Sequence, residues 1–146
     1  MEPKKQEDVQ KDTEKKLQAK YMEFQSIEQQ MRQLDNNLQT LDGQLMEIKS
    51  MQQSIKEMES IKKNSEIMVP VAAGMFVKGT ITDSNTILVN VGNNVLVDKT
   101  IPQAVELLEK QIGEMSGIRA QIISQLNKMG VKMQTLDNEL QKLVQG

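Results

Sequence analysis

The feature that most constrains this chain is a seven-residue repeat of apolar side chains, which occurs near both of its ends. In the first repeat, apolar residues occupy the first (a) and fourth (d) positions of each heptad, interrupted by Lys20 and Gln52. A helix on the surface of a compact core shows a wider apolar face over a shorter run, so this pattern predicts a coiled coil. After Ile48 we expect the frame to shift by about one position and to bring Met51 into the stripe. The apolar repeat positions are Leu17, Phe24, Met31, Leu38 and Leu45 at a, and Ile27, Leu34, Leu41, Ile48 and Ile55 at d.

The second repeat runs from Val105 to Leu143, and Arg119 is its one polar position. Arg119 is expected to form an ion pair with Asp42 or Glu47 of the first helix, because the two helices should fold back antiparallel on each other. Thr100 and Gln103 have the spacing of a capping box, which predicts where this helix begins. The apolar repeat positions are Val105, Ile112, Leu126, Met133 and Leu140 at a, and Leu108, Met115, Ile122, Met129, Leu136 and Leu143 at d.

The segment between the helices is rich in Val, Ile and Thr and predicts four short strands, which form two β-hairpins. The strands are expected at Ile67–Val71, Met75–Ile81, Thr86–Val91 and Val95–Asp98. Several of them are apolar on both faces, and one short hairpin cannot bury both. Strands from several subunits are therefore expected to combine in one sheet or barrel. The residues expected to mediate this oligomerisation are Ile67, Val69, Val71, Phe76, Val77, Ile87, Val89, Val91, Val95 and Val97.

The predicted organisation is a single α+β domain over residues 1–146. Residues 1–64 form the first coiled-coil helix, residues 65–99 the β-hairpin oligomerisation region, and residues 100–146 the second coiled-coil helix. The first sixteen residues mix lysines with acidic residues and are expected to extend beyond the second helix, solvated or disordered.

Composition argues against several classes of function. The chain has neither cysteine nor histidine, so disulfides, thiol nucleophiles and histidine ligands are excluded, and we expect no catalysis, metal or cofactor. A net charge of −2 and three aromatic residues disfavour nucleic-acid binding. The glycines at 74 and 79 have phosphate-loop spacing without the lysine that should follow, and the turn at Asp83 lacks the later ligands of a calcium loop. The chain shows neither a signal peptide nor a membrane span, and a cytoplasmic location is expected.

The candidate binding residues lie at the helix ends far from the strands, where seam residues cannot all be covered by the partner helix. Exposed apolar groups at such a place are a liability unless they bind something. These residues are Leu17, Tyr21, Met22, Phe24, Leu140, Leu143 and Val144.

The middle of the chain contains Ile67-Met68-Val69-Pro70-Val71, followed by residues 74–81 and then residues 87–100. The first two stretches are similar to the "VP…G…V.G.I" signature of the alpha class of prefoldin subunits, and residues 87–100 look like that family's passage from strand to helix. The resemblance extends over the whole chain, since the family has coiled coils on both sides of these strands. Four strands resemble the alpha class, whereas beta-class subunits have one hairpin.

This resemblance implies a hexamer of two alpha and four beta subunits, in which the strands build a double β-barrel and the coiled coils project from it. It also implies that unfolded proteins are captured at the coiled-coil tips without ATP and passed to a group II chaperonin. The alternative is a structural coiled coil, a spacer or a filament-forming relative that assembles with itself through the same strands.

Overall fold

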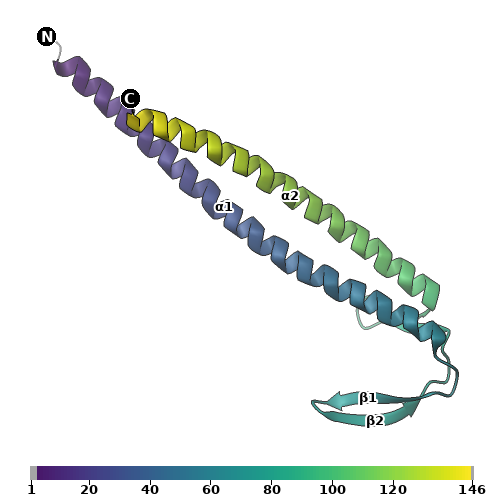
Figure 1. Ribbon diagram of the computed structural model, residues 1–146. Helices are drawn as coiled ribbons and strands as arrows, with labels where there is room; N and C mark the ends of the chain where they lie inside the picture. Colours follow the sequence, from purple (N-terminus) through teal and green to yellow (C-terminus); the bar gives the residue numbers. More distant parts are fainter. Residues whose placement is uncertain (1–2, 146) are drawn as a thin grey trace. The chain divides into compact units, whose positions relative to one another are not determined.

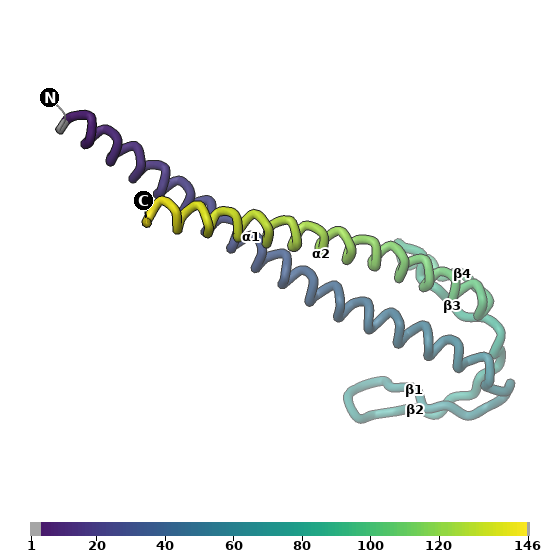
Figure 2. Tube along the Cα trace, turned by 45° about the horizontal axis from the view of Figure 1, so that its top comes forward, coloured from purple at the N-terminus to yellow at the C-terminus, as the bar shows by residue number. Residues whose placement is uncertain are grey.

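The computed structural model describes residues 3–145 and consists of two long α-helices joined by two antiparallel β-hairpins, which confirms the predicted fold class (Figures 1 and 2). The described residues form two compact units, one of residues 3–42 with 117–145 and one of residues 43–116. None of the helices described in residues 3–145 is long and apolar enough to cross a membrane. The elements in chain order are α1 (Pro3–Glu57), the 3-10 helix η1 (Met58–Ser60), β1 (Glu66–Ala72), β2 (Met75–Thr80), β3 (Thr86–Asn90), β4 (Leu96–Thr100) and α2 (Ile101–Gln145).

The first unit is an antiparallel pair of helices. Glu23 of α1 faces Lys132 of α2, and Asp42, further along α1, faces Arg119, earlier in α2. The two views of this unit agree, since the last turns of α2 lie beside an early part of α1 in both (Figures 1 and 2). The seam side chains Ile27, Leu41 and Leu136 are buried, and the other apolar repeat positions of the unit are half-buried. The heptad pattern therefore predicted the helix pairing correctly.

Arg119, the polar residue of the second repeat, forms the ion pair that its position predicts. Its Nε lies 2.6 Å from Oδ1 of Asp42, which was one of the two expected partners. Both side chains keep about two fifths of their surface exposed, so solvent screens the pair.

In the second unit, the expected placement of Met51 in the apolar stripe is wrong. Met51 is 53% exposed, whereas Gln52 is 8% exposed and occupies the next a position of the unshifted frame. The Gln52 amide nitrogen donates to the Glu109 carboxylate at 2.6 Å and to the Val105 carbonyl oxygen at 3.4 Å. Because these acceptors on α2 satisfy the amide, a polar residue can occupy this seam position in place of Met51.

The start of α2 is fixed by the predicted capping box. The backbone N–H of Gln103 donates to the Thr100 hydroxyl oxygen at 3.3 Å, and the backbone N–H of Thr100 donates to the Gln103 side-chain oxygen at 3.1 Å. Ile101 and Ala104 are buried directly behind the cap. The capping box therefore places the end of β4 and the first turn of α2 against the core of the second unit.

The hairpins pair β1 with β2 and β3 with β4, with Val69 opposite Val77 and Val89 opposite Val97 (Figure 2). Between the hairpins, the Asp83 carboxylate accepts the backbone N–H of Asn85 at 2.8 Å and the Thr86 hydroxyl at 2.7 Å. The Thr86 hydroxyl, and then the Asn85 N–H, lower the pKa of Asp83 below its ordinary value. Asp83 therefore closes a turn, as its sequence context indicates.

Candidate functional site

An apolar groove of about 580 Å³ lies in the first unit, between the early turns of α1 and the last described turns of α2. Its lining is almost entirely apolar, so the glutamines and the glutamate along it contribute their methylene groups. We call it the helix-end groove. Its residues are Glu14, Leu17, Gln18 and Tyr21 of α1 and Leu140, Gln141, Val144 and Gln145 of α2.

Helical spacing explains why these side chains share one groove. Leu17 and Tyr21 are four residues apart, as are Leu140 and Val144, so each helix places two apolar groups one above the other. Tyr21 is 55% exposed and Val144 is 74% exposed, so the groove is open to a ligand. Exposed apolar side chains gathered in a concave surface are typical of a binding site.

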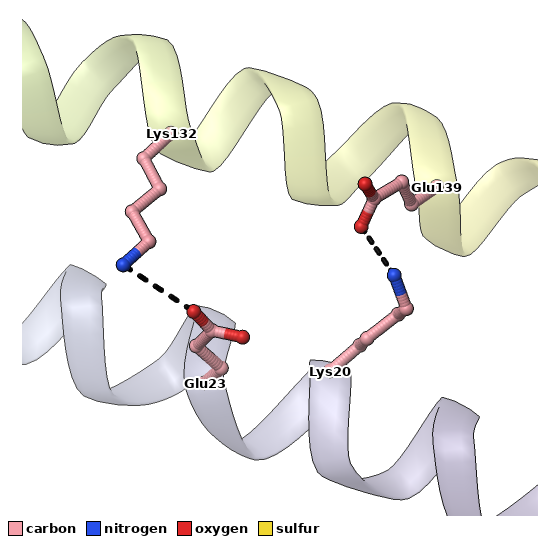
Figure 3. Close-up of polar contacts among 4 residues, drawn as sticks. All are labelled: Lys20, Glu23, Lys132 and Glu139. Atoms are coloured by element: carbon pink, nitrogen blue, oxygen red, sulfur yellow. Dashed lines mark hydrogen bonds and ion pairs between the residues drawn. The ribbon is translucent and has the colours of Figure 1, made fainter.

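Two ion pairs join the helices of this unit (Figure 3). The Lys20 ammonium group contacts the Glu139 carboxylate, and Lys132 Nζ lies 3.4 Å from Glu23 Oε1. The charges are arranged in opposite order, because α1 supplies the cation of one pair and the anion of the other. All four side chains are partly exposed, so each pair contributes about 0–1 kcal/mol to the stability of the fold. Their arrangement favours this alignment of the two helices over shifted ones.

The structure separates the predicted binding residues into three groups. Leu17, Tyr21, Leu140 and Val144 line the helix-end groove. Phe24 and Leu143 are half-buried repeat positions and do not line it. Met22 is 63% exposed and is also outside the groove lining.

Sequence reasoning missed the polar half of the groove, which consists of Glu14, Gln18, Gln141 and Gln145. On α1 the lining comes from the a position and its neighbours at b and e, and on α2 from positions a, b, e and f, whereas the d residues Lys20 and Leu143 do not contribute. The b and e positions beside the a residues at the helix ends are the signal that could have identified Glu14, Gln18 and Gln141, whereas Gln145 lies at an f position, which carries no such signal.

The hairpins carry a second exposed apolar surface. Most of the valines predicted to mediate oligomerisation are exposed, as is Phe76. Ile67, Ile87 and Val89 are half-buried within the chain itself. Ile87 and Val89 line an apolar groove of about 500 Å³ together with Met51, Ile55 and Leu108, among others. Four exposed apolar residues of the hairpins were not included in the prediction, namely Met68, Met75, Leu88 and Leu96. The other exposed apolar residues of the hairpins are Val69, Val71, Phe76, Val77, Val91, Val95 and Val97.

The weak ligand motifs of the sequence have structural roles. Gly74 lies in the turn between β1 and β2 with φ +74°, and Gly79 lies within β2, so the phosphate-loop spacing falls in a hairpin. Within residues 3–145, no three acidic side chains gather closely enough to hold a metal ion.

Comparison with known proteins identifies relatives over most of the chain. Residues 27–146 match the family described as prefoldin subunit. The chain is 33% identical over 81 residues to prefoldin subunit alpha of Thermofilum pendens, a stretch that covers 56% of this chain and 63% of that protein. It is 42% identical over 53 residues to prefoldin subunit alpha of Pyrococcus horikoshii, covering 36% of each chain. The chain therefore matches less than two thirds of the length of these relatives.

Two solved structures share the fold. A filamentous PFD from Methanocaldococcus jannaschii, determined by cryo-EM, matches with a TM-score of 0.70 and 17% identity over 80% of this chain and 96% of that one. The crystal structure of the prefoldin beta subunit from Thermococcus strain KS-1 matches with a TM-score of 0.57 and 19% identity over 87% and 90% of the two chains. Both matches show how this chain folds.

Proposed function

This chain belongs to the prefoldin subunit family, and from that premise we propose that it is the alpha subunit of an ATP-independent chaperone that holds unfolded proteins. The observation that carries the proposal is the helix-end groove, which leaves Leu17, Tyr21, Leu140 and Val144 accessible in one apolar concavity. Unfolded chains differ from folded ones by exposing apolar side chains, which is the chemistry that this groove can bind.

The proposed mechanism is weak, repeated apolar binding. Burial of one side chain of the size of leucine contributes about 1.5 to 3 kcal/mol, which alone gives only transient contact. Several grooves on separate subunits would act together on one client and raise the overall affinity, while each single contact still dissociates quickly. Such a complex prevents aggregation and releases its client readily, which suits transfer to a group II chaperonin. No step of this cycle requires a nucleotide or a covalent bond.

We propose that the hairpins join two alpha subunits to four beta subunits. A two-stranded hairpin is at best marginally stable in water, and both hairpins here carry exposed apolar residues such as Phe76 and Leu96. Pairing with strands of neighbouring subunits in a barrel would bury these groups and satisfy the open strand edges. The proposed complex acts in the cytoplasm, with neither nucleic acid nor a membrane as a partner.

The alternative is a structural, filament-forming protein that assembles with copies of itself through the hairpins. The likeness to the filamentous PFD favours this second candidate, because a filament can be built on the same fold. A purely structural role gives the helix-end groove no task. Variants of the groove therefore distinguish the two functions.

The proposal is tested by replacing Tyr21 and Val144 together with serine. The double variant should suppress the aggregation of guanidinium-denatured citrate synthase about tenfold less well than the wild type, because two apolar contacts are lost. The measurement is light scattering after dilution of the denatured enzyme into the assembled complex. Size-exclusion chromatography checks that the variant still assembles.

The matched control is Ile118→Ser with Val131→Ser, which removes two exposed apolar side chains of α2 outside the groove. The control should protect the denatured enzyme as the wild type does. Equal protection by the groove variant and the wild type would contradict the proposed site and leave the structural function as the better explanation.

A further inference from the structure

The heptad frame of α1 continues before the helix-end groove, but its character changes. Counting back from Leu17, the a and d positions between residues 4 and 16 are Gln10 at a and Thr13 and Gln6 at d. Every lysine and acidic residue between 4 and 16 lies at one of the other heptad positions. We call Gln6, Gln10 and Thr13 the polar lane. Residues at a and d share one face of a helix, so the lane continues the face on which Leu17 lies.

Gln6 and Gln10 of the polar lane are exposed in the part of the chain that the structure describes. Thr13 is half-buried, and its hydroxyl group donates to the Val9 carbonyl oxygen at 2.8 Å. Gln145, the last described residue of α2, lines the groove together with Glu14 of α1. In both views α1 extends past this end of α2 (Figures 1 and 2). The seam face of these turns therefore has no described part of α2 opposite it.

The uncharged polar side chains of the polar lane are typical neither of a surface that packs against another helix nor of a surface that only faces solvent. A second helix docks stably when a and d are apolar, and here they are not. A face directed only at water would have no reason to exclude the charges that fill the rest of this segment. A glutamine amide both donates and accepts hydrogen bonds, so it matches the N–H and C=O groups of an unfolded main chain.

We propose that the polar lane binds the extended main chain of the same client segment whose apolar side chains enter the helix-end groove. Gln6 lies eleven residues before Leu17, which corresponds to about 16 Å along a helix. About five residues of extended polypeptide cover that distance. The preferred ligand is thus an extended segment with an apolar centre and a flank free of secondary structure. The inference rests on the proposed function, because the groove must bind the apolar centre.

The test uses a fluorescein-labelled 12-residue peptide with an apolar centre, and the same peptide with N-methylated amides in both flanks. Methylation removes main-chain donors and leaves the side chains unchanged. Fluorescence anisotropy measures binding to the full chain in the assembly that it forms. Gln6→Ala with Gln10→Ala should weaken binding of the unmodified peptide about three- to tenfold, the loss expected for two hydrogen bonds. It should weaken binding of the methylated peptide less, because that peptide keeps only its carbonyl groups as hydrogen-bond partners for the two glutamines.

The matched control is Asp8→Ala with Lys11→Ala, which also adds two alanines to the helix and leaves the net charge unchanged. This control should bind the unmodified peptide as the wild type does. The inference is overturned if the lane variant keeps wild-type affinity, or if the control loses as much affinity as the lane variant. The Tyr21→Ser and Val144→Ser variant separates the two proposals. If the groove variant loses binding of the peptide and the lane variant does not, only the lane inference fails. If the groove variant also binds the peptide like the wild type, the proposed function fails.

Discussion

Single polar residues determine how the two helices of this chain are aligned. Gln52 and Arg119 stand at a positions that an ideal seam would fill with apolar side chains, and each finds a polar partner on the other helix. Gln52 is the more demanding of the two, because it is 8% exposed and its amide needs acceptors at that level of the seam. Such residues reduce stability and favour one alignment, since any shifted register would bury them unpaired.

Replacing Gln52 with leucine should therefore raise stability. Leucine buries apolar surface in the same place, while the Glu109 carboxylate, on an exposed residue, returns to water. We expect a gain of about 1 kcal/mol and a rise in Tm of roughly 2–4 °C, measured by thermal unfolding at 222 nm. Gln44→Leu, at an exposed position of α1, is the control and should change Tm little. A lower Tm for Gln52→Leu would show that the hydrogen bonds of Gln52 are net stabilising.

At the scale of elements, a single residue, Thr100, joins β4 to α2. Thr100 pairs with Thr86 across the β3–β4 ladder and also caps α2 through its hydroxyl group. The same residue therefore ends a strand and begins a helix. This places Ile101 and Ala104 in the core immediately after the cap.

Thr100→Ala should lower the free energy of unfolding by about 1 kcal/mol, because the N–H of Gln103 loses its acceptor at the helix start. Thr100→Ser keeps the hydroxyl and should restore most of the loss. Urea denaturation followed by circular dichroism measures both variants. Equal destabilisation by alanine and serine would mean that the methyl group of Thr100, and not its hydrogen bond, stabilises this junction.

At the scale of the whole molecule, two exposed apolar surfaces have different proposed tasks. The helix-end groove is proposed to bind clients, and the hairpin residues are proposed to bind neighbouring subunits. If these tasks are separate, one can be removed without the other. The groove variants described above should assemble normally, so the complementary experiment removes assembly.

Val77→Lys places a charge on the exposed face of β2 and should prevent assembly with beta-type subunits, because the ammonium group would be buried in the subunit interface. Val131→Lys, on the exposed surface of α2, is the matched control and should assemble as the wild type does. Native mass spectrometry of complexes purified from the source cells measures the composition. A wild-type complex that contains only copies of this chain would contradict the two-alpha, four-beta proposal and favour the filament-forming alternative.

Features that depend on residues close together in the sequence were predictable from it. The seven-residue repeats gave the antiparallel helices, the spacing of Thr100 and Gln103 gave the cap, and the turn residues gave two hairpins. The pairing of Arg119 with an acidic residue of the first helix also followed, and of the two expected partners, Asp42 and Glu47, the structure shows Asp42. Periodicity and local hydrogen bonding are properties of short segments, so they can be recognised without knowledge of the tertiary fold.

Features that depend on how each helix is rotated against its partner were decided by the tertiary structure alone. Gln52 and not Met51 fills the seam, because acceptors on α2 stand within reach of its amide. Val144 and Gln145 line the groove while Leu143 does not, although all three are neighbours in the chain. Ile87 and Val89 turn toward the helices of their own chain, which apolar character alone does not indicate. The polarity of a side chain indicates whether its burial would be favourable. Whether the side chain is in fact buried depends on the surface that the tertiary structure packs against it.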